Sequence, residues 1–129
     1  MITEDYVSLE TAKLLKEKGF DEATYHDYAP NGARWFEEVL VNHNSRGGVA
    51  CPTLQMAMKW LREVCKLHIT VVPFPLNFEH EDIQDGWGCE VTHLSDLSYD
   101  GNYEFFQKKY PIYEEACEAA IKYCLENLI

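Results

Sequence analysis

Basic residues are scarce in this sequence of 129 residues, which has 11 Lys and Arg against 22 Asp and Glu and a formal net charge of −11. The densest basic group is the pair Lys108-Lys109. A chain with this charge repels phosphate backbones and anionic membrane surfaces. We therefore expect no direct binding to nucleic acid or membranes, although such a charge also serves simply to keep a protein soluble.

Signals for export and for membrane insertion are missing too. Residues 1–6 have neither the basic nor the apolar stretch of a secretory signal, and no apolar run reaches the length of a membrane span. The number of cysteines is odd, and no two of them have Cys-x-x-Cys spacing. These features favour a cytoplasmic protein without a disulfide framework. The five cysteines are Cys51, Cys65, Cys89, Cys117 and Cys124.

The common motifs of metal and cofactor sites are also absent, since the sequence has no His-Glu-x-x-His and no glycine-rich phosphate loop. Cys89 and His93 share a predicted strand face but lie about 13 Å apart, too far to bind one ion. Cys117 and Cys124 lie two helical turns apart, about 10.5 Å, and are expected in the core. We therefore expect no metal, no cofactor and no catalytic residue.

The sequence does have the composition of a soluble globular domain, with 47% hydrophobic and 26% charged residues. Its length predicts one domain over residues 1–129. Ser8 and Gly19 have the positions of an N-cap and of the residue that follows a helix. Two further helices are predicted to begin at Cys51-Pro52 and at Pro111, because proline is tolerated in a first helical turn.

Five segments have the composition or alternation of strands. Pro30-Asn31-Gly32 predicts a hairpin turn between the first two of them, although Arg34 to Leu40 is also compatible with a short helix. The predicted order is α-ββ-α-ββ(β)-α, an α+β fold with helices on one face of a mainly antiparallel sheet. A weak echo between residues 8–17 and 53–63 leaves open whether an αββ unit is repeated. The strand segments are 24–28, 34–41, 68–72, 87–94 and 103–106.

Seven short stretches together carry a resemblance that spans most of the chain. They are Tyr6-Val7-Ser8, residues 12–20, Cys51-Pro52-Thr53, residues 59–63, His68-Ile69, residues 113–116 and Asn127-Leu128-Ile129. In these stretches the chain resembles a group of small uncharacterised proteins found in phages and prophages of gut bacteria. The resemblance implies a bacterial or phage cytoplasmic setting. Its motifs are helix signatures, so it transfers no functional residue.

Two short motifs could carry chemistry. Residues 96–107 follow the twelve-residue calcium loop at positions one, three, five, six and nine, but Gln107 replaces the bidentate carboxylate at position twelve. A hairpin turned at Asp100-Gly101 is therefore favoured. The second motif is Cys51 at the predicted start of a helix, because a thiol at a helix N-terminus can become a thiolate and pair with a histidine. The resembling group often has alanine there, and we favour a structural role for Cys51.

Aromatic and acidic residues mix between Phe74 and Phe106, which is typical of a protein interface or a cation-binding surface. The candidate surface residues are Phe78, Glu79, Glu81, Asp82, Trp87, Tyr99 and Tyr103. A core this small cannot cover all the aromatic side chains, so we expect a homodimer that forms through apolar surface of the sheet or of this segment. The apolar candidates are Phe74, Phe78, Trp87, Phe105 and Phe106.

Three functions remain open at this stage. The first is a non-enzymatic cytoplasmic module that binds other proteins, either its own copy or a host protein. The second is an acidic decoy that imitates nucleic acid and occupies a host protein's binding surface. The third is a small enzyme with a Cys/His or carboxylate site. The lack of a catalytic motif favours the first.

We predict that calcium does not stabilise the protein, because Gln107 cannot supply the bidentate ligand of a calcium loop. Thermal melts in calcium and in chelator should coincide. A melting temperature that rises by several degrees with calcium concentration would contradict this prediction.

Overall fold

The computed structural model describes residues 1–73, 86–95 and 103–129, and for residues 103–107 it describes the backbone only. The element order confirms the predicted α+β fold, with an additional short strand and a 3-10 turn before the second helix. The elements are α1 (Leu9–Glu17), β1 (Thr24–Tyr28), β2 (Arg34–Val41), η1 (Asn44–Arg46), β3 (Val49–Ala50), α2 (Leu54–Glu63), β4 (Leu67–Pro73), β5 (Trp87–His93), β6 (Tyr103–Tyr110) and α3 (Tyr113–Asn127).

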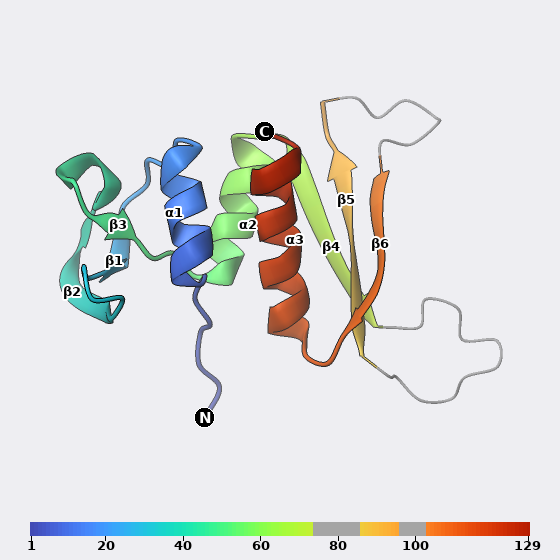
Figure 1. Ribbon diagram of the computed structural model, residues 1–129, viewed down its shortest axis with the longest axis horizontal. Coiled ribbons are helices and arrows are strands. Elements are labelled where there is room, and N and C mark those ends of the chain that lie inside the picture. The colour runs from blue at the N-terminus through green and yellow to red at the C-terminus, as the bar shows by residue number, and fades with distance from the viewer. Residues whose placement is uncertain (74–85, 96–102) are drawn as a thin grey trace.

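The strands form two antiparallel three-stranded sheets, with the orders β2-β1-β3 and β4-β5-β6. The helices lie between them, and α2 and α3 pack on one face of the β4-β5-β6 sheet, as expected (Figure 1). The sequence did not show that the strands divide. They divide because β3 returns beside β1, so that the first sheet is complete before α2 begins. The central strand is β1 in the first sheet and β5 in the second. The similar sequences of residues 8–17 and 53–63 therefore do not begin two units of the same topology.

Helix α1 has the boundaries that its sequence indicates. The Ser8 Oγ accepts a hydrogen bond from the Thr11 amide at 3.2 Å, which caps the first turn. Gly19 has a φ of +97°, a value that favours glycine, and the Phe20 amide donates to the Leu15 carbonyl at 2.9 Å. Local capping chemistry therefore sets both ends of this helix.

The predicted starts of the other two helices were wrong by about two residues. Thr53, rather than Cys51 or Pro52, is the N-cap of α2, and its hydroxyl accepts from the Met56 amide at 3.1 Å. Pro52 lies in extended chain, where its carbonyl accepts a hydrogen bond from the Val7 amide at 3.1 Å. Strand β6 continues to Tyr110, so Pro111 separates strand from helix instead of occupying the first turn of α3.

The segment that partly matches a calcium loop, residues 96–107, follows β5, and its last five residues belong to β6. Strands β5 and β6 pair antiparallel, with Thr92 opposite Tyr103 and Val91 opposite Glu104. A calcium loop of this type is followed by a helix, whereas residues 103–110 form β6. This arrangement agrees with a hairpin, although the expected turn at Asp100-Gly101 lies outside the described residues.

Helix α3 is the centre of the core. It contacts α1, α2 and all three strands of the β4-β5-β6 sheet. Small residues on its buried face allow these elements to approach closely. The side chains of α3 with no exposed surface are Ala116, Cys117, Ala120, Ile121, Cys124 and Leu125.

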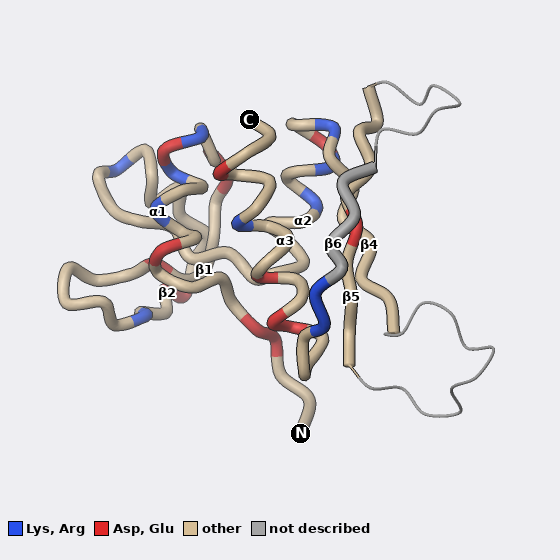
Figure 2. The backbone as a smooth tube through the Cα atoms, turned by 45° about the vertical axis from the view of Figure 1, so that its right-hand side comes forward, with Lys and Arg blue, Asp and Glu red and all other residues tan. Residues whose placement is uncertain are grey.

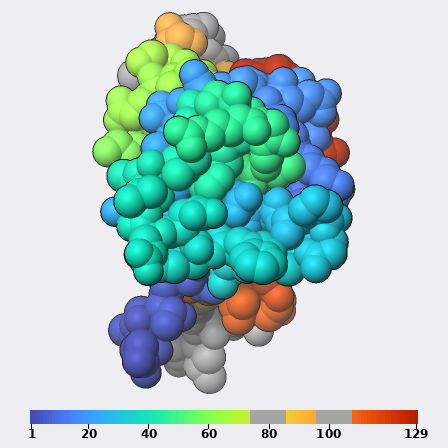
Figure 3. All heavy atoms as spheres, turned by 90° about the vertical axis from the view of Figure 1, so that its left-hand side faces the viewer, coloured from blue at the N-terminus to red at the C-terminus, as the bar shows by residue number. Residues whose placement is uncertain are grey.

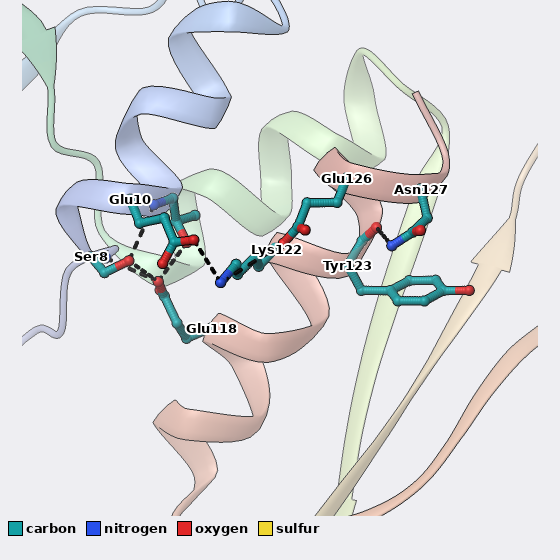
Figure 4. A network of polar contacts seen from close by, with 8 residues as sticks. Ser8, Glu10, Glu118, Lys122, Tyr123, Glu126 and Asn127 are labelled. Carbon is teal, nitrogen blue, oxygen red and sulfur yellow. Dashed lines mark hydrogen bonds and ion pairs between the residues drawn. The ribbon is translucent and has the colours of Figure 1, made fainter.

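A polar network joins α3 to the start of α1 (Figure 4). The Glu118 Oε1 accepts hydrogen bonds from the Ser8 amide at 3.1 Å, the Ser8 hydroxyl at 2.5 Å and the Thr11 hydroxyl at 2.6 Å. One turn further along α3, the Lys122 ammonium lies 2.8 Å from a Glu10 carboxylate oxygen. A carboxylate at a helix N-terminus is stabilised by the amide groups there. Glu118 therefore holds α1 and α3 together from outside the apolar core.

We predict that Glu118→Ala lowers the free energy of unfolding by about 1.5–3 kcal/mol, because it removes a charged acceptor and leaves the buried Thr11 hydroxyl without its partner. Urea denaturation measures this change. Glu115→Ala is the matched control, because this substitution removes the same charge from an exposed position on the same helix. The control should change stability by no more than about 0.5 kcal/mol. Equal effects of the two variants would show that the network does not stabilise the fold.

Candidate interaction surface

Five large hydrophobic side chains are exposed together on the β1–β2 hairpin. The exposed fractions are 58% for Trp35, 63% for Phe36, 65% for Val39, 56% for Leu40 and 47% for Tyr25. We call these five residues the hairpin surface. The segment that contains β2 forms much of the face opposite the β4-β5-β6 sheet (Figure 3, teal). Several exposed apolar side chains on one hairpin, here divided between its two faces, are typical of an interaction site, whereas single exposed hydrophobic residues are common on any protein.

The sequence of β2 explains why these side chains stay exposed. Successive side chains of a strand point to opposite faces, and in Arg34–Val41 both faces carry apolar residues. Phe36 and Leu40 line a hollow of about 340 Å³ next to Tyr25 and His26. Trp35 lines a different hollow, of about 460 Å³, together with residues of α1 and of the loop before β3. No single packing partner on one face could bury both groups.

A register shift between β1 and β2 increases this exposure. His26 pairs with Phe36, but the next pair is Thr24 with Val41. Tyr25 of β1 therefore lies opposite four residues of β2, Glu37–Leu40, which form a large bulge. The bulged part includes Val39 and Leu40, two of the most exposed apolar residues of the strand.

The other end of the hairpin is held to the N-terminal segment by aromatic contacts. The ring centroid of His26 lies 4.5 Å from that of Tyr6 and 5.3 Å from that of Phe36. The Arg34 guanidinium lies 4.0 Å from the Tyr6 ring centroid, in a cation–π contact. Burial, and then the charge of Arg34, lower the pKa of His26 below its usual value, so His26 stays neutral at pH 7.

No protein-family model, no curated protein and no solved structure matches this chain. In the described residues, no helix is both long enough and apolar enough to cross a membrane.

Most of the surface predicted from the sequence falls outside the described residues. Phe78, Glu79, Glu81, Asp82 and Tyr99 lie outside the described residues. Trp87 is half-buried in β5, where its ring meets the Tyr113 ring edge-on at 5.2 Å. Tyr103 begins β6, and its side chain is not described.

Sequence reasoning missed the hairpin surface, although one signal for it was present. The order of residues in β2, two apolar, two acidic and three apolar after Arg34, does not alternate as in a strand with one buried face. Such a strand cannot bury its apolar residues on a single face. The possible short helix at these positions was wrong, because residues 34–41 form β2.

Cys51 has the surroundings of a structural residue. It is 1% exposed, and its thiol donates a hydrogen bond to the Val7 carbonyl, with an Sγ–O distance of 3.8 Å. Burial raises the pKa of Cys51 to about 11, so the thiol stays protonated at neutral pH. The alternative, a pKa lowered by a helix N-terminus, does not apply to Cys51, because α2 begins only at Leu54.

One further pair of side chains in the described residues, His43 and Asp27, has the composition of an acid–base pair. His43 Nδ1 lies 3.8 Å from an Asp27 carboxylate oxygen, but the opposite ring nitrogen of His43 is buried and unpaired. A general base needs an accessible nitrogen beside its substrate. In the described part of the chain, no three His, Cys, Asp or Glu side chains come together as a metal site would require.

We predict that a thiol reagent such as iodoacetamide labels Cys65 first in the native protein, because Cys65 is partly exposed and the other four cysteines are buried. Mass spectrometry of the labelled peptides gives the order. In a Cys65→Ser variant, native labelling should be slow and should become fast in urea. Labelling of native Cys51 ahead of Cys65 would contradict its structural role.

Proposed function

We propose that this chain is a non-enzymatic protein-interaction module that forms a homodimer through the hairpin surface. The observation that carries the proposal is the gathering of five side chains, 47–65% exposed, on one hairpin. Three aromatic side chains that are each about half exposed offer roughly 300 Å² of apolar area. Val39 and Leu40 add to this area, and a standard interface buries about 800 Å² on each partner. The hairpin surface therefore supplies a large share of what a stable dimer needs.

The partner that we propose is a second copy, and the net charge means that apolar surface has to make the contact. Each chain carries a charge of −11, so two copies repel one another at a distance. A dimer therefore needs an apolar patch that meets itself, and two-fold symmetry gives this contact most simply. A host protein with a complementary apolar surface remains the alternative partner.

The other two candidate functions gain less support. Lys and Arg are interspersed with Asp and Glu along the described chain (Figure 2), whereas a nucleic-acid mimic needs acidic residues spread over one face. An enzyme needs an activated group, and burial raises the pKa of Cys51, Cys89 and Cys117 to about 11. The free cysteines support the cytoplasmic location that we propose. Phage or prophage origin rests on the sequence resemblance alone.

We predict that the protein is dimeric at tens of micromolar in sedimentation experiments, and that added salt strengthens the dimer by screening its repulsion. Val39→Ser and Phe36→Ser should each weaken association by about tenfold or more. Val64→Ser is the matched control, because Val64 is 57% exposed but lies alone at the end of α2. The control should associate as the wild type does.

A monomer at these concentrations in high salt would refute the proposed dimer. A dimer that dissociates as salt rises would show that paired charges, rather than apolar contacts, hold it together. Equal weakening by Val39→Ser and Val64→Ser would place the interface away from the hairpin.

A further inference from the structure

Strand β2 is an open edge of its sheet, with β1 as its neighbour among the described strands. The Ala29 amide donates to the Ala33 carbonyl at 2.8 Å, which identifies Ala29 and Ala33 as a hydrogen-bonded pair. In an antiparallel ladder such pairs alternate along the strand. The backbone groups of Arg34 and Phe36 therefore point away from β1, toward the open edge. Consistent with this alternation, the carbonyl of His26, which pairs with Phe36, accepts instead from the Cys51 amide on the other side.

This edge is only partly protected against pairing with another strand. Edge strands are commonly protected by short length, proline, charged residues such as lysine, or bulges. Strand β2 has eight residues and contains neither lysine nor proline. The one feature that interrupts it is the bulge at Glu37–Leu40, and the register with β1 is regular over Arg34–Phe36.

The two faces of the hairpin restrict how a partner can cover it. Trp35 and Phe36 are neighbours in sequence, so they line hollows on opposite faces of the sheet. A partner that packs on one face leaves the other residue exposed. A strand added beside β2 places its own alternating side chains next to Trp35 on one face and next to Phe36 on the other.

We propose that β2 pairs antiparallel with β2 of a second copy across a two-fold axis at Phe36. This inference rests on the proposed homodimer and specifies how it forms. The two three-stranded sheets become one six-stranded sheet, in which the outward backbone groups of Phe36 pair with those of Phe36 in the second copy. Exposed main-chain edges are a general means of protein association.

Charge determines the register. The two-fold axis lies perpendicular to the sheet, so the same face of both copies lies on the same side of the joined sheet. One residue of β2 then lies directly opposite the same residue of the second copy. An axis at Glu37 or Glu38 would place two like carboxylates directly opposite each other, which is destabilising. An axis at Phe36 places Phe36 opposite the partner's Phe36 and Arg34 opposite the partner's Glu38. Along β2, Phe36 is the position that gives Arg34 a glutamate partner.

Charge reversal tests this register. Arg34→Glu places two glutamates opposite each other at both symmetry-related positions, and Glu38→Arg places two arginines there. Each variant alone should dimerise about tenfold more weakly than the wild type. An equimolar mixture should recover association as a heterodimer, because each pair then contains one glutamate and one arginine. The double variant Arg34→Glu/Glu38→Arg should also dimerise.

The net charge makes the Glu38→Arg arm informative. This change makes the chain less negative by two units, so general repulsion falls and association should strengthen if Glu38 has no opposing partner. Weakening is therefore expected from the proposed register and not from net charge. Arg34→Glu makes the chain more negative by two units, and Arg62→Glu on α2 is its control because it makes the same change away from β2. The Arg62→Glu variant should dimerise more strongly than the Arg34→Glu variant. Association is measured by sedimentation, and the heterodimer by native mass spectrometry.

A cross-link provides a second measurement that does not depend on charge. In a Cys65→Ser background, Phe36→Cys places two thiols at the axis, so mild oxidation should give a disulfide-linked dimer. Val39→Cys, off the axis, should cross-link much more slowly.

The outcomes separate the two proposals. The hairpin dimer stands if the wild type dimerises and Val39→Ser weakens the dimer. The strand pairing is nevertheless wrong if the mixture of the two charge variants forms no heterodimer and Phe36→Cys cross-links no faster than Val39→Cys. A wild-type monomer overturns both proposals.

Discussion

The burial of helix α3 is the constraint on which the rest of the structure depends. Its small side chains, such as Ala116 and Ala120, have no exposed surface and let α1, α2 and the β4-β5-β6 sheet approach its backbone closely. The apolar faces of α1 and α2 are used in this contact. Glu118 and Lys122 add polar contacts to the start of α1. Apolar packing and polar contacts with α3 therefore both hold α1 in position.

This use of the core leaves the first sheet with little to pack against. The β2-β1-β3 sheet reaches the helices mainly through β3, which contacts α1, and β2 lies on the far side of β1. No third apolar layer exists in the described residues to cover Trp35 on one face and Phe36 on the other. The exposure of the hairpin surface is therefore a consequence of the topology, and an added strand is the simplest structure that would reduce it.

Burial also explains why the reactive groups of the described residues are better suited to structure than to catalysis. The thiols of Cys51, Cys89 and Cys117 are removed from water, which raises their pKa values and keeps them neutral. The buried Thr11 hydroxyl likewise serves structure, because it donates a hydrogen bond to Glu118. The proposed function therefore rests on a surface and not on these groups.

Local chemistry in the sequence determined the element order, the two ends of α1 and the β1–β2 turn, because capping and turn residues act over a few positions. The starts of α2 and α3 were misjudged, because Pro52 and Pro111 are equally compatible with extended chain and Thr53 was the better cap. The tertiary structure alone decided that the strands form two sheets and that, among the described side chains, Trp35 and Phe36 are more exposed than Trp87. Exposure depends on what packs against each face of a strand, and distant elements such as α3 and β3 determine this, so no local pattern could reveal it.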